Sequence, residues 1–240
     1  LSGVPKVLLL LDAIGAPHPT YAHLPLLVNE SRQKLSKRRD DVAMGDFRDR
    51  GYLPEAMVNY LALLGWGPPD DVEVRPIGEI VDLFRIEDVN KAAAFFDLRK
   101  LEHVNATHLR GLAKPDFVER VGPWLADAPW SPERFDEGIF DRMVDLVQEK
   151  LRTLGDITRF VDFLFLEDPV DDPESWEKAM VKAPLAAEML DGAATVLADC
   201  AWDTASVLAA VAGVGESLGL KLGKAQAPVR VAVTGRPVGP

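Results

Sequence analysis

Six consecutive segments with helical spacing of apolar residues constrain the fold of this chain more than any other feature of its sequence. They occupy residues 116–125, 133–151, 157–166, 174–181, 185–199 and 204–219. Apolar residues that recur every three to four positions form one face of a helix, and that face has to be buried against another element. In this half of the chain only Val229–Val233 alternates like a strand. We therefore predict a nearly all-helical structure after Ala113, with one late strand.

The first part of the chain has a mixed pattern. Apolar residues at helical spacing follow Pro5 and stop at Gly15, and the apolar run Leu24–Val28 is typical of a short buried strand. Further helices are predicted over 54–64, 77–84 and 98–103. The first of these has proline in its first turn, where its missing N–H costs nothing. The predicted fold class is mainly α, with a small α/β part at the N-terminal side.

The composition shift near Ala113 also indicates the domain organisation. A chain of 240 residues is long enough for one large domain or for two to three small ones. We expect three: a mixed domain over residues 1–113, a first helical subdomain over 114–172 and a second over 173–240.

The net charge of -11 argues against indiscriminate attraction to nucleic acid, because phosphate binding needs a positive face. A specific RNA binder with this charge has to segregate it, and the sequence does so. Acidic residues crowd 167–177, whereas five basic residues fall within eight positions: Arg32, Lys34, Lys37, Arg38 and Arg39.

Cysteine content and hydropathy exclude other classes. Cys200 is the only cysteine, so an internal disulfide is excluded and a reducing cytoplasm is the simplest setting. No apolar run approaches the length of a membrane span.

The four histidines, His18, His23, His103 and His108, do not cluster by spacing, and we predict no metal site. The acidic pairs Asp70-Asp71 and Asp171-Asp172 lie beside prolines, where turns favour acids, and are weak catalytic candidates.

A basic pentapeptide, Lys34-Leu35-Ser36-Lys37-Arg38, lies in the polar stretch Asn29–Asp41 just after the predicted strand. Two ammonium groups spaced three residues apart, with a hydroxyl between them, can close on a triphosphate and neutralise the charge that develops as pyrophosphate leaves. Taken alone, such a pentapeptide is more often a solvated surface or a nucleic-acid patch. Its sequence context decides between these interpretations.

Four segments stand in a set order: AHLPLLVN at 22–29, KLSKR at 34–38, GYLPEA at 51–56 and NYLALLGW at 59–66. In order and spacing they resemble bacterial glutamyl-tRNA synthetases. FDLRKL at 96–101, with Asn105 and HLR at 108–110, is similar to the segment that closes the stem-contact domain of that family. VRVAVTGRP at 229–237 is similar to its C-terminal anticodon-side motif. The resemblance is dense over residues 20–110, thin through the middle helices, and sharp again from Val229.

The resemblance assigns roles to the basic loop. The pentapeptide is similar to the family's variant of the class I KMSKS signature, with Leu35 for Met and Arg38 for the final Ser. It implies that Lys37 contacts ATP, with Arg38 beside it in the ATP-binding set, and that Lys34 and Ser36 shape the loop that closes over ATP. ATP, with Mg²⁺, is then the cofactor of the full-length enzyme, and we expect none to be bound by these residues alone.

For tRNA, the resemblance points to Arg230 and to the terminal Gly239-Pro240 segment as readers of the anticodon. RNA recognition generally targets unstacked loop bases by hydrogen bonding and stacking. The alternative for Arg230 is an ion pair with a nearby carboxylate. Lys150 and Arg152, at the end of a predicted helix, are further candidates for facing the anticodon. They are equally well explained as favourable charges at a helix C-terminus.

The implied architecture is a stem-contact domain (1–113) that carries the KMSKS-type loop, followed by two helical subdomains that form an anticodon-binding cage. The implied activity is that of a glutamate–tRNA ligase. The resemblance further implies a cytoplasmic monomer whose partners are tRNA-Glu, ATP and L-glutamate and which does not bind a membrane. No HIGH-type motif and no Rossmann-like series is present in these residues. We therefore expect them to be inactive in aminoacylation on their own. The alternative is a free-standing, non-catalytic tRNA-binding or scaffolding module derived from a synthetase.

Overall fold

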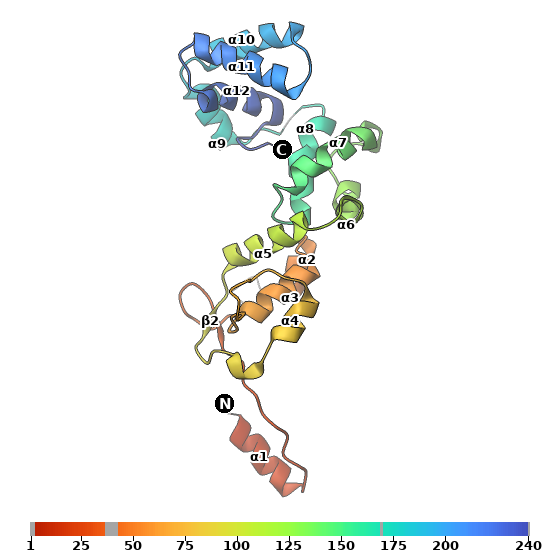
Figure 1. Ribbon diagram of the computed structural model, residues 1–240, viewed down its shortest axis with the longest axis vertical. Helices are drawn as coiled ribbons and strands as arrows, with labels where there is room; N and C mark the ends of the chain where they lie inside the picture. The colour runs from red at the N-terminus through yellow and green to blue at the C-terminus, as the bar shows by residue number, and fades with distance from the viewer. Residues whose placement is uncertain (1–2, 37–42, 169, 240) are drawn as a thin grey trace. The chain divides into compact units, whose positions relative to one another are not determined.

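The computed structural model describes residues 3–36, 43–168 and 170–239. The chain divides into two compact units, Leu1–Gly111 and Leu112–Pro240 (Figure 1). Each unit is described by itself. The further division of the second unit into two subdomains remains a prediction.

The first unit contains short helices and two short strands. Its elements are α1 (Val4–Ala13), β1 (Leu27–Val28), α2 (Met44–Asp49), α3 (Pro54–Leu63), α4 (Ile77–Leu83), the 3₁₀ helix η1 (Ile86–Asp88), β2 (Ala94–Phe95) and α5 (Leu98–Arg110). The predicted first helix is thus present, although none of its residues is buried.

All elements of regular secondary structure among the described residues of the second unit are helices. Its elements are α6 (Lys114–Ala126), η2 (Pro132–Arg134), α7 (Glu137–Gln148), η3 (Leu154–Asp156), α8 (Ile157–Phe165), α9 (Pro173–Trp176), the π-helix η4 (Glu177–Val181), α10 (Ala186–Asp199), α11 (Thr204–Ser217) and α12 (Leu222–Thr234). The predicted fold class, mainly α with a small α/β part, is confirmed.

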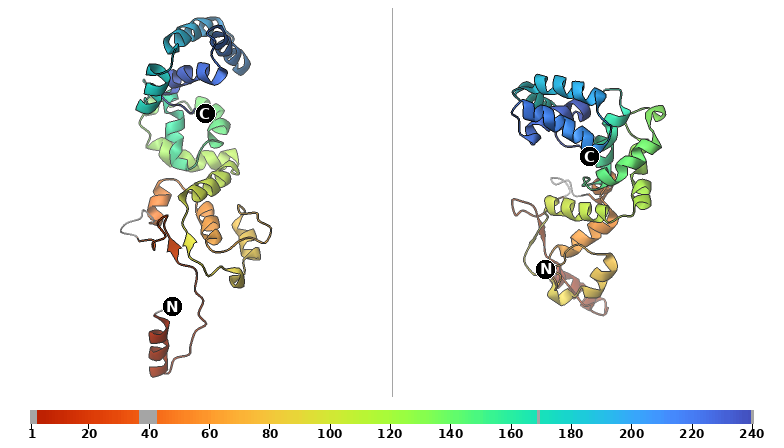
Figure 2. Two further views of the ribbon diagram at one scale, coloured as in Figure 1. Left: turned by 90° about the vertical axis from the view of Figure 1, so that its left-hand side faces the viewer. Right: turned by 45° about the horizontal axis from the view of Figure 1, so that its top comes forward.

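The described sheet consists of β1 and β2, which run parallel, with Leu27 opposite Ala94 and Val28 opposite Phe95 (Figure 2). The strand predicted from Leu24 is shorter than expected. Leu24 and Leu26 are 70% and 52% exposed, and Pro25 has no N–H to contribute to a ladder. Strand pairing therefore begins only at Leu27.

The core of the first unit is formed where α3 packs against α5 (Figure 1). Tyr60 on α3 and Leu101 and Val104 on α5 are each at most 1% exposed. The fully buried Asn105 side chain accepts a hydrogen bond from the Leu53 amide, 2.8 Å away. Leu53 is the N-cap residue of α3, and its amide is one of the first N–H groups, which have no partner within the helix.

A buried polar network on the same two helices involves Asn59 and His108. The Asn59 Oδ1 atom accepts from the Arg75 amide and lies 3.0 Å from His108 Nε2, while its Nδ2 donates to the Glu73 carbonyl. Burial lowers the pKa of His108 below its ordinary value of 6.5, and the negative charge of Glu55 only partly opposes this. The site therefore favours the neutral imidazole.

This lowered pKa predicts how the stability of the first unit depends on pH. Because the unfolded chain binds the His108 proton more readily than the folded one, the free energy of unfolding should be highest above pH 6.5 and decrease as the pH falls below it. We expect the urea concentration at the midpoint of unfolding of the wild-type chain to be lower at about pH 5.5 than at about pH 7.5. In a His108→Gln variant, that drop should be smaller. An equal drop in both proteins would contradict the role assigned to His108.

The second unit has two groups of packed helices. In the first, α6 packs on α7 and α8, and an aromatic cluster lies between them. The ring of the buried Phe165 has its centroid 5.3 Å from that of Trp130 and 4.9 Å from that of Phe135, which in turn contacts Phe140. These contacts fix the position of α8, which also binds the C-terminal segment through Asp162.

In the second group α10, α11 and α12 pack on one another (Figure 1). Their shared core contains Met189, Ala193, Val211 and Ala225. The strand predicted over Val229–Val233 is wrong, because these residues lie inside α12. The buried residues of α12 recur every third position: Ala225, Pro228, Val231 and Thr234. Packing of that face against α10 and α11 outweighs the weak strand preference of valine.

Among the residues that the structure describes, no single helix combines the length and apolar composition of a membrane span. Helices α11 and α12 meet that test only when taken as one segment, and they are bent by 118° at the break between them.

Candidate functional site

The KMSKS-type loop begins with a tight reversal of the chain directly after β1. The Asn29 amide donates to the Gln33 carbonyl, and the Asn29 side chain accepts from the Gln33 amide. Arg32 adopts a left-handed conformation with φ 57°. Lys34 then pairs with Val28 in an isolated antiparallel bridge, and the Leu35 amide donates to the Leu27 carbonyl. The backbone of Lys34 is thereby held against β1.

The sheet ties this loop to the core of the first unit. On its other side β1 pairs with β2, and the Phe96 amide donates to the Val28 carbonyl. The Phe96 ring packs edge-on against Tyr60, with centroids 5.3 Å apart. The next residue, Asp97, caps α5 by accepting hydrogen bonds from the Arg99 and Lys100 amides. The FDLRKL segment therefore connects the base of the loop to α3 and α5.

Within this loop the predicted site residues differ in what the structure describes. Lys34 is exposed, and Ser36 is half-buried. Lys37 and Arg38 lie outside the described residues. The geometry thus gives Lys34 a fixed backbone and an exposed side chain, which suits a cation that is to bind a polyphosphate. The roles of all four residues remain predictions.

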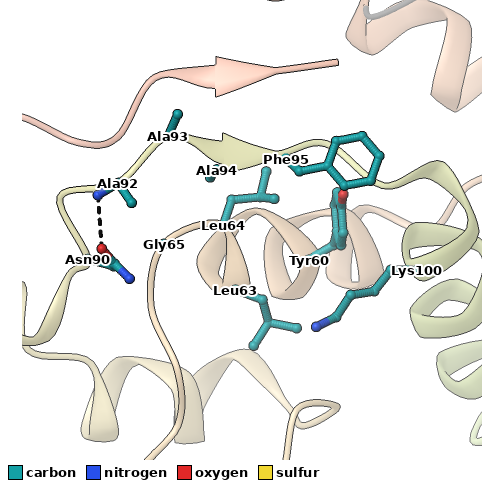
Figure 3. Close-up of a pocket in the computed structure, with 10 residues that line it drawn as sticks. All are labelled: Tyr60, Leu63, Leu64, Gly65, Asn90, Ala92, Ala93, Ala94, Phe95 and Lys100. Carbon is teal, nitrogen blue, oxygen red and sulfur yellow. Dashed lines mark hydrogen bonds between the residues drawn. The ribbon is translucent and has the colours of Figure 1, made fainter. Parts of the chain in front are cut away.

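A cavity of about 320 Å³ opens beside β2 in the same unit. Figure 3 shows the side chains of Tyr60 on α3 and of Leu64, the residue after α3, on the side of the segment Ala92–Phe95, while the Leu63 side chain points away from it. The Tyr60 hydroxyl is buried and has no hydrogen-bond partner among the described residues, and burial raises the pKa of Tyr60 well above the ordinary value. It therefore remains a protonated hydroxyl. The cavity was not expected from the sequence, because Lys100 is the one charged residue among those that line it.

The acidic pairs that the sequence marked as weak catalytic candidates have structural contacts. Asp70 accepts a hydrogen bond from the Arg75 guanidinium at 2.5 Å, and bonds to the Val72 amide and Arg75 lower the pKa of Asp70. Asp172 caps α9 by accepting from the Ser175 amide and hydroxyl, which lowers the pKa of Asp172. Among the described residues, no group of three or more His, Cys, Asp or Glu side chains is placed to hold a metal ion.

In the second unit, the C-terminal motif forms the end of α12 and the turn that follows it. Gly235 ends the helix with φ 69°, a conformation that favours glycine. A Cβ at this position would overlap the Val170 carbonyl group. The Gly235 carbonyl accepts from the Asp172 amide. The chain after Thr234 is therefore held closely against the segment that precedes α9.

This turn brings Arg230 and Gly239 close together. Arg230 is exposed, and its Nη1 donates to the Pro237 carbonyl at 3.0 Å. A Cβ at Gly239 would lie 4.0 Å from Arg230 Cδ. No described carboxylate lies within ion-pair distance of the Arg230 guanidinium. Pro240 lies outside the described residues.

Lys150 and Arg152 lie in the connection after α7, which ends at Gln148. Both are exposed. The Lys150 amide donates to the Val147 carbonyl, and the Arg152 amide to Asp156 Oδ2. Their backbones are thus ordered by a helix end and by the capping box of η3. A tRNA contact and a favourable charge near the helix end remain the two predicted roles of these residues.

A buried ion pair beside this motif was not expected from the sequence. The Arg236 guanidinium binds both carboxylate oxygens of Asp162 on α8, with N···O distances of 2.6 and 2.5 Å. Hydrogen bonding to Asp162 raises the pKa of Arg236. The signal that could have revealed it is an aspartate at the edge of the apolar face of an otherwise hydrophobic helix, ITRFVDFLF.

Comparison with known proteins gives matches over the whole chain. A family model described as "Anticodon binding domain" matches residues 116–240. A second model, "tRNA synthetases class I (E and Q), catalytic domain", matches residues 1–103, which include the KMSKS-type loop. The first model thus covers the helical part of the fold and the second the mixed part.

Curated relatives agree with these models. A glutamate–tRNA ligase from Thermobifida fusca (strain YX) is 53% identical over 243 residues, and one from Salinispora arenicola (strain CNS-205) is 48% identical over 246 residues. The alignments cover 100% of this chain, 51% of the first relative and 52% of the second. The chain therefore spans about half the length of the curated relatives it matches.

Solved structures share the fold. A crystal structure of a glutamate tRNA ligase from Elizabethkingia meningosepticum CCUG26117, in complex with its amino acid, matches with a TM-score of 0.72 and 26% identity, covering 100% of this chain and 51% of that chain. A glutamate-tRNA synthetase structure from Elizabethkingia anophelis matches with a TM-score of 0.68 and 26% identity, covering 100% and 50%.

The fold, the loop and these matches define a protein of the class I aminoacyl-tRNA synthetases with a helical anticodon-binding region. Relatives about 50% identical along the entire chain narrow this class further. Through residues 116–240 the chain belongs to the family of this anticodon-binding domain, and the resemblance to glutamyl-tRNA synthetases noted in its sequence motifs is confirmed.

Proposed function

We propose that this chain is the tRNA-binding C-terminal portion of a glutamate–tRNA ligase, which activates L-glutamate with ATP and transfers it to tRNA-Glu. The single observation that carries the proposal is the exposed Arg230 guanidinium beside Gly239, within a unit that matches an anticodon-binding family. A guanidinium with open surface next to it can donate to the edges of unstacked bases.

The first unit contributes to activation through its loop. Lys34 and Lys37 would place two ammonium groups beside the phosphates of ATP, and Ser36 and Arg38 would complete the loop. Positive charge held there stabilises the negative charge that develops on the leaving pyrophosphate. Mg²⁺ would enter on the phosphate oxygens, as it commonly does in nucleotide sites. Catalysis of this kind is mainly positioning and charge stabilisation.

The proposal includes limits on what these residues do alone. The 240 residues contain no HIGH-type motif, so we expect the isolated chain to bind tRNA-Glu and to show no aminoacylation and no ATP binding of its own. We further propose that the enzyme acts as a monomer in the cytoplasm. The single cysteine among these 240 residues fits a reducing compartment. Measurable glutamylation of tRNA by the isolated chain would contradict the first of these statements.

A salt-dependent binding titration tests the proposal directly. The chain is titrated with tRNA-Glu, with a tRNA-Glu carrying an altered anticodon, and with an unrelated tRNA, at several salt concentrations. We expect the tightest binding for tRNA-Glu, with a preference that persists at higher salt, because contacts to bases depend on salt less than contacts to phosphates. Equal affinity for all three RNAs would refute anticodon reading.

The Arg230→Ala variant sharpens this test. Loss of a guanidinium that contacts a base should weaken binding of tRNA-Glu by roughly 5- to 150-fold and relax the preference over the anticodon variant. The matched control is Lys221→Ala, which removes an exposed cation from the start of the same helix. It should weaken binding of every tRNA slightly and equally. If Arg230→Ala behaves like this control, Arg230 contacts phosphate instead of a base.

A further inference from the structure

The Arg236–Asp162 ion pair joins two parts of the second unit that are far apart in sequence. Asp162 lies on α8, within the first group of helices, and Arg236 lies in the turn after α12, at the end of the second group. The Nη1 atom of Arg236 donates to Asp162 Oδ1 and also to the Arg159 carbonyl, while Nη2 donates to Asp162 Oδ2. The pair therefore fixes both the direction and the distance of the turn relative to α8.

The two side chains are too enclosed for a surface role. The exposed fraction is 11% for the Arg236 side chain and 7% for that of Asp162. A bidentate pair of this kind has a defined geometry, and leaving one partner unpaired in a buried site is strongly unfavourable. Since its donors already face Asp162 and a backbone carbonyl, the Arg236 guanidinium is occupied within the fold.

The residues around this pair belong to the segment proposed to read the anticodon. The Thr234 hydroxyl donates to the Arg230 carbonyl and accepts from the Arg236 amide. The Arg230 guanidinium in turn donates to the carbonyl of Pro237, the residue after Arg236. Pro237 also lines a cavity of about 600 Å³ between α9, η4 and α12. The position of Arg236 is therefore transmitted to Arg230 through two short hydrogen-bonded links.

We propose that Asp162 and Arg236 are positioning residues for anticodon recognition. Their ion pair holds the segment Gly235–Gly239 on α8, so that Arg230 and Gly239 present one fixed surface to RNA. This inference rests on the proposed function, because it concerns the same site. The first helical group, which itself contributes no residue to the C-terminal motif, thus sets the geometry from which that motif reads bases.

A nearly isosteric variant separates positioning from charge. Asp162→Asn keeps the shape of the side chain but removes one acceptor and the negative charge that orient Arg236. It also makes the chain more positive by one charge, so a purely electrostatic effect would tighten binding to every tRNA. If the pair positions the C-terminal segment, the effect is instead on specificity. The preference for tRNA-Glu over its anticodon variant then falls, by about fivefold or more.

Two further variants complete the set. Arg236→Lys keeps the positive charge but not the bidentate geometry, and it should lose preference in the same direction as Asp162→Asn. The control is Arg134→Ala, which breaks the exposed pair of Arg134 with Glu167, whose side chains are 47% and 84% exposed. It should leave the preference unchanged. Thermal unfolding of each variant is measured alongside, and the affinities are compared at a temperature where all variants are folded.

The outcomes distinguish the inference from the function beneath it. If the wild-type chain prefers tRNA-Glu and Asp162→Asn keeps the full preference while folded, the inference is overturned and the proposed function stands. If Asp162→Asn or Arg236→Lys changes the affinity for both tRNAs equally, the pair acts on charge or stability alone, which also overturns it. If the wild-type chain shows no preference, the proposed function fails and the inference falls with it.

Discussion

Replacing Lys37 by alanine in the full-length enzyme should slow glutamyl-adenylate formation by roughly 100-fold or more, the usual loss when one preorganised charge-stabilising group is removed. The leaving pyrophosphate gains negative charge in the transition state, and an ammonium group in the closed loop stabilises that charge more than it stabilises bound ATP. The rate to measure is that of ATP–pyrophosphate exchange, with tRNA present. Affinity for tRNA-Glu, measured separately, should stay nearly the same.

The matched control for this experiment is Arg39→Ala. It removes the same unit of charge from the same basic stretch but lies outside the pentapeptide. If general attraction between a basic loop and ATP were the whole effect, both variants would lose activity alike, mostly as a weaker affinity for ATP. An exchange rate that is unchanged in Lys37→Ala refutes the role of Lys37.

The structure adds an expectation for Lys34, the first lysine of the pentapeptide. The backbone at Lys34 is bonded to β1 through Val28 and Leu27. Its place is therefore set by the sheet before any ligand arrives. Lys37 lies three residues further along. We expect Lys34→Ala to have the smaller effect on the exchange rate, because an anchored cation contributes to binding in both the ground state and the transition state.

Long helices were predicted correctly from the sequence because their burial pattern is local. Helices α3, α6, α8, α10 and α11 each carry apolar residues at three- and four-residue spacing, and the Asp203 side chain caps α11 by accepting from the Ser206 amide. The π-helix η4 lies within a segment that was predicted as one ordinary helix. Its wider turn depends on packing against α10 and α12, which no local pattern encodes.

Short elements depend on partners distant in sequence and were predicted poorly. Strand β2 has only two residues, Ala94 and Phe95, and it exists because its backbone pairs with β1 some 67 positions earlier. The alternation of valines in α12 fits a strand equally well in isolation. Only the neighbouring helices α10 and α11 decide that every third residue of this segment is buried.

The site residues that could be predicted from the sequence are those whose charged side chains are also exposed. Lys34 and Arg230, both named from the sequence, are exposed, as charged side chains outside an apolar face usually are. The positioning pair was missed for the converse reason. Asp162 and Arg236 are buried by each other, and a pair separated by 74 positions leaves no spacing rule to follow.

The largest loss of stability in the second unit is expected from Phe165→Ala. Phe165 is 1% exposed and contacts both Trp130 and Phe135. Removing a fully buried aromatic ring costs about 3–5 kcal/mol of unfolding free energy, through lost burial and the cavity left behind. That is a large part of the stability of an ordinary domain. Phe165 also lies three residues after Asp162, so the variant should disturb the support of the C-terminal segment.

Tryptophan fluorescence in urea is the suitable measurement, since Trp124, Trp130, Trp176 and Trp202 all lie in the second unit. The control is Leu146→Ala on α7, a side chain that is 54% exposed and whose removal should cost no more than about 0.5 kcal/mol. With two units in the chain, the midpoint for the second unit has to be followed separately from that of the first. A loss below about 1 kcal/mol in Phe165→Ala would mean that the aromatic cluster can close the gap, and that α8 is held mainly by its other contacts, the Arg236 pair among them.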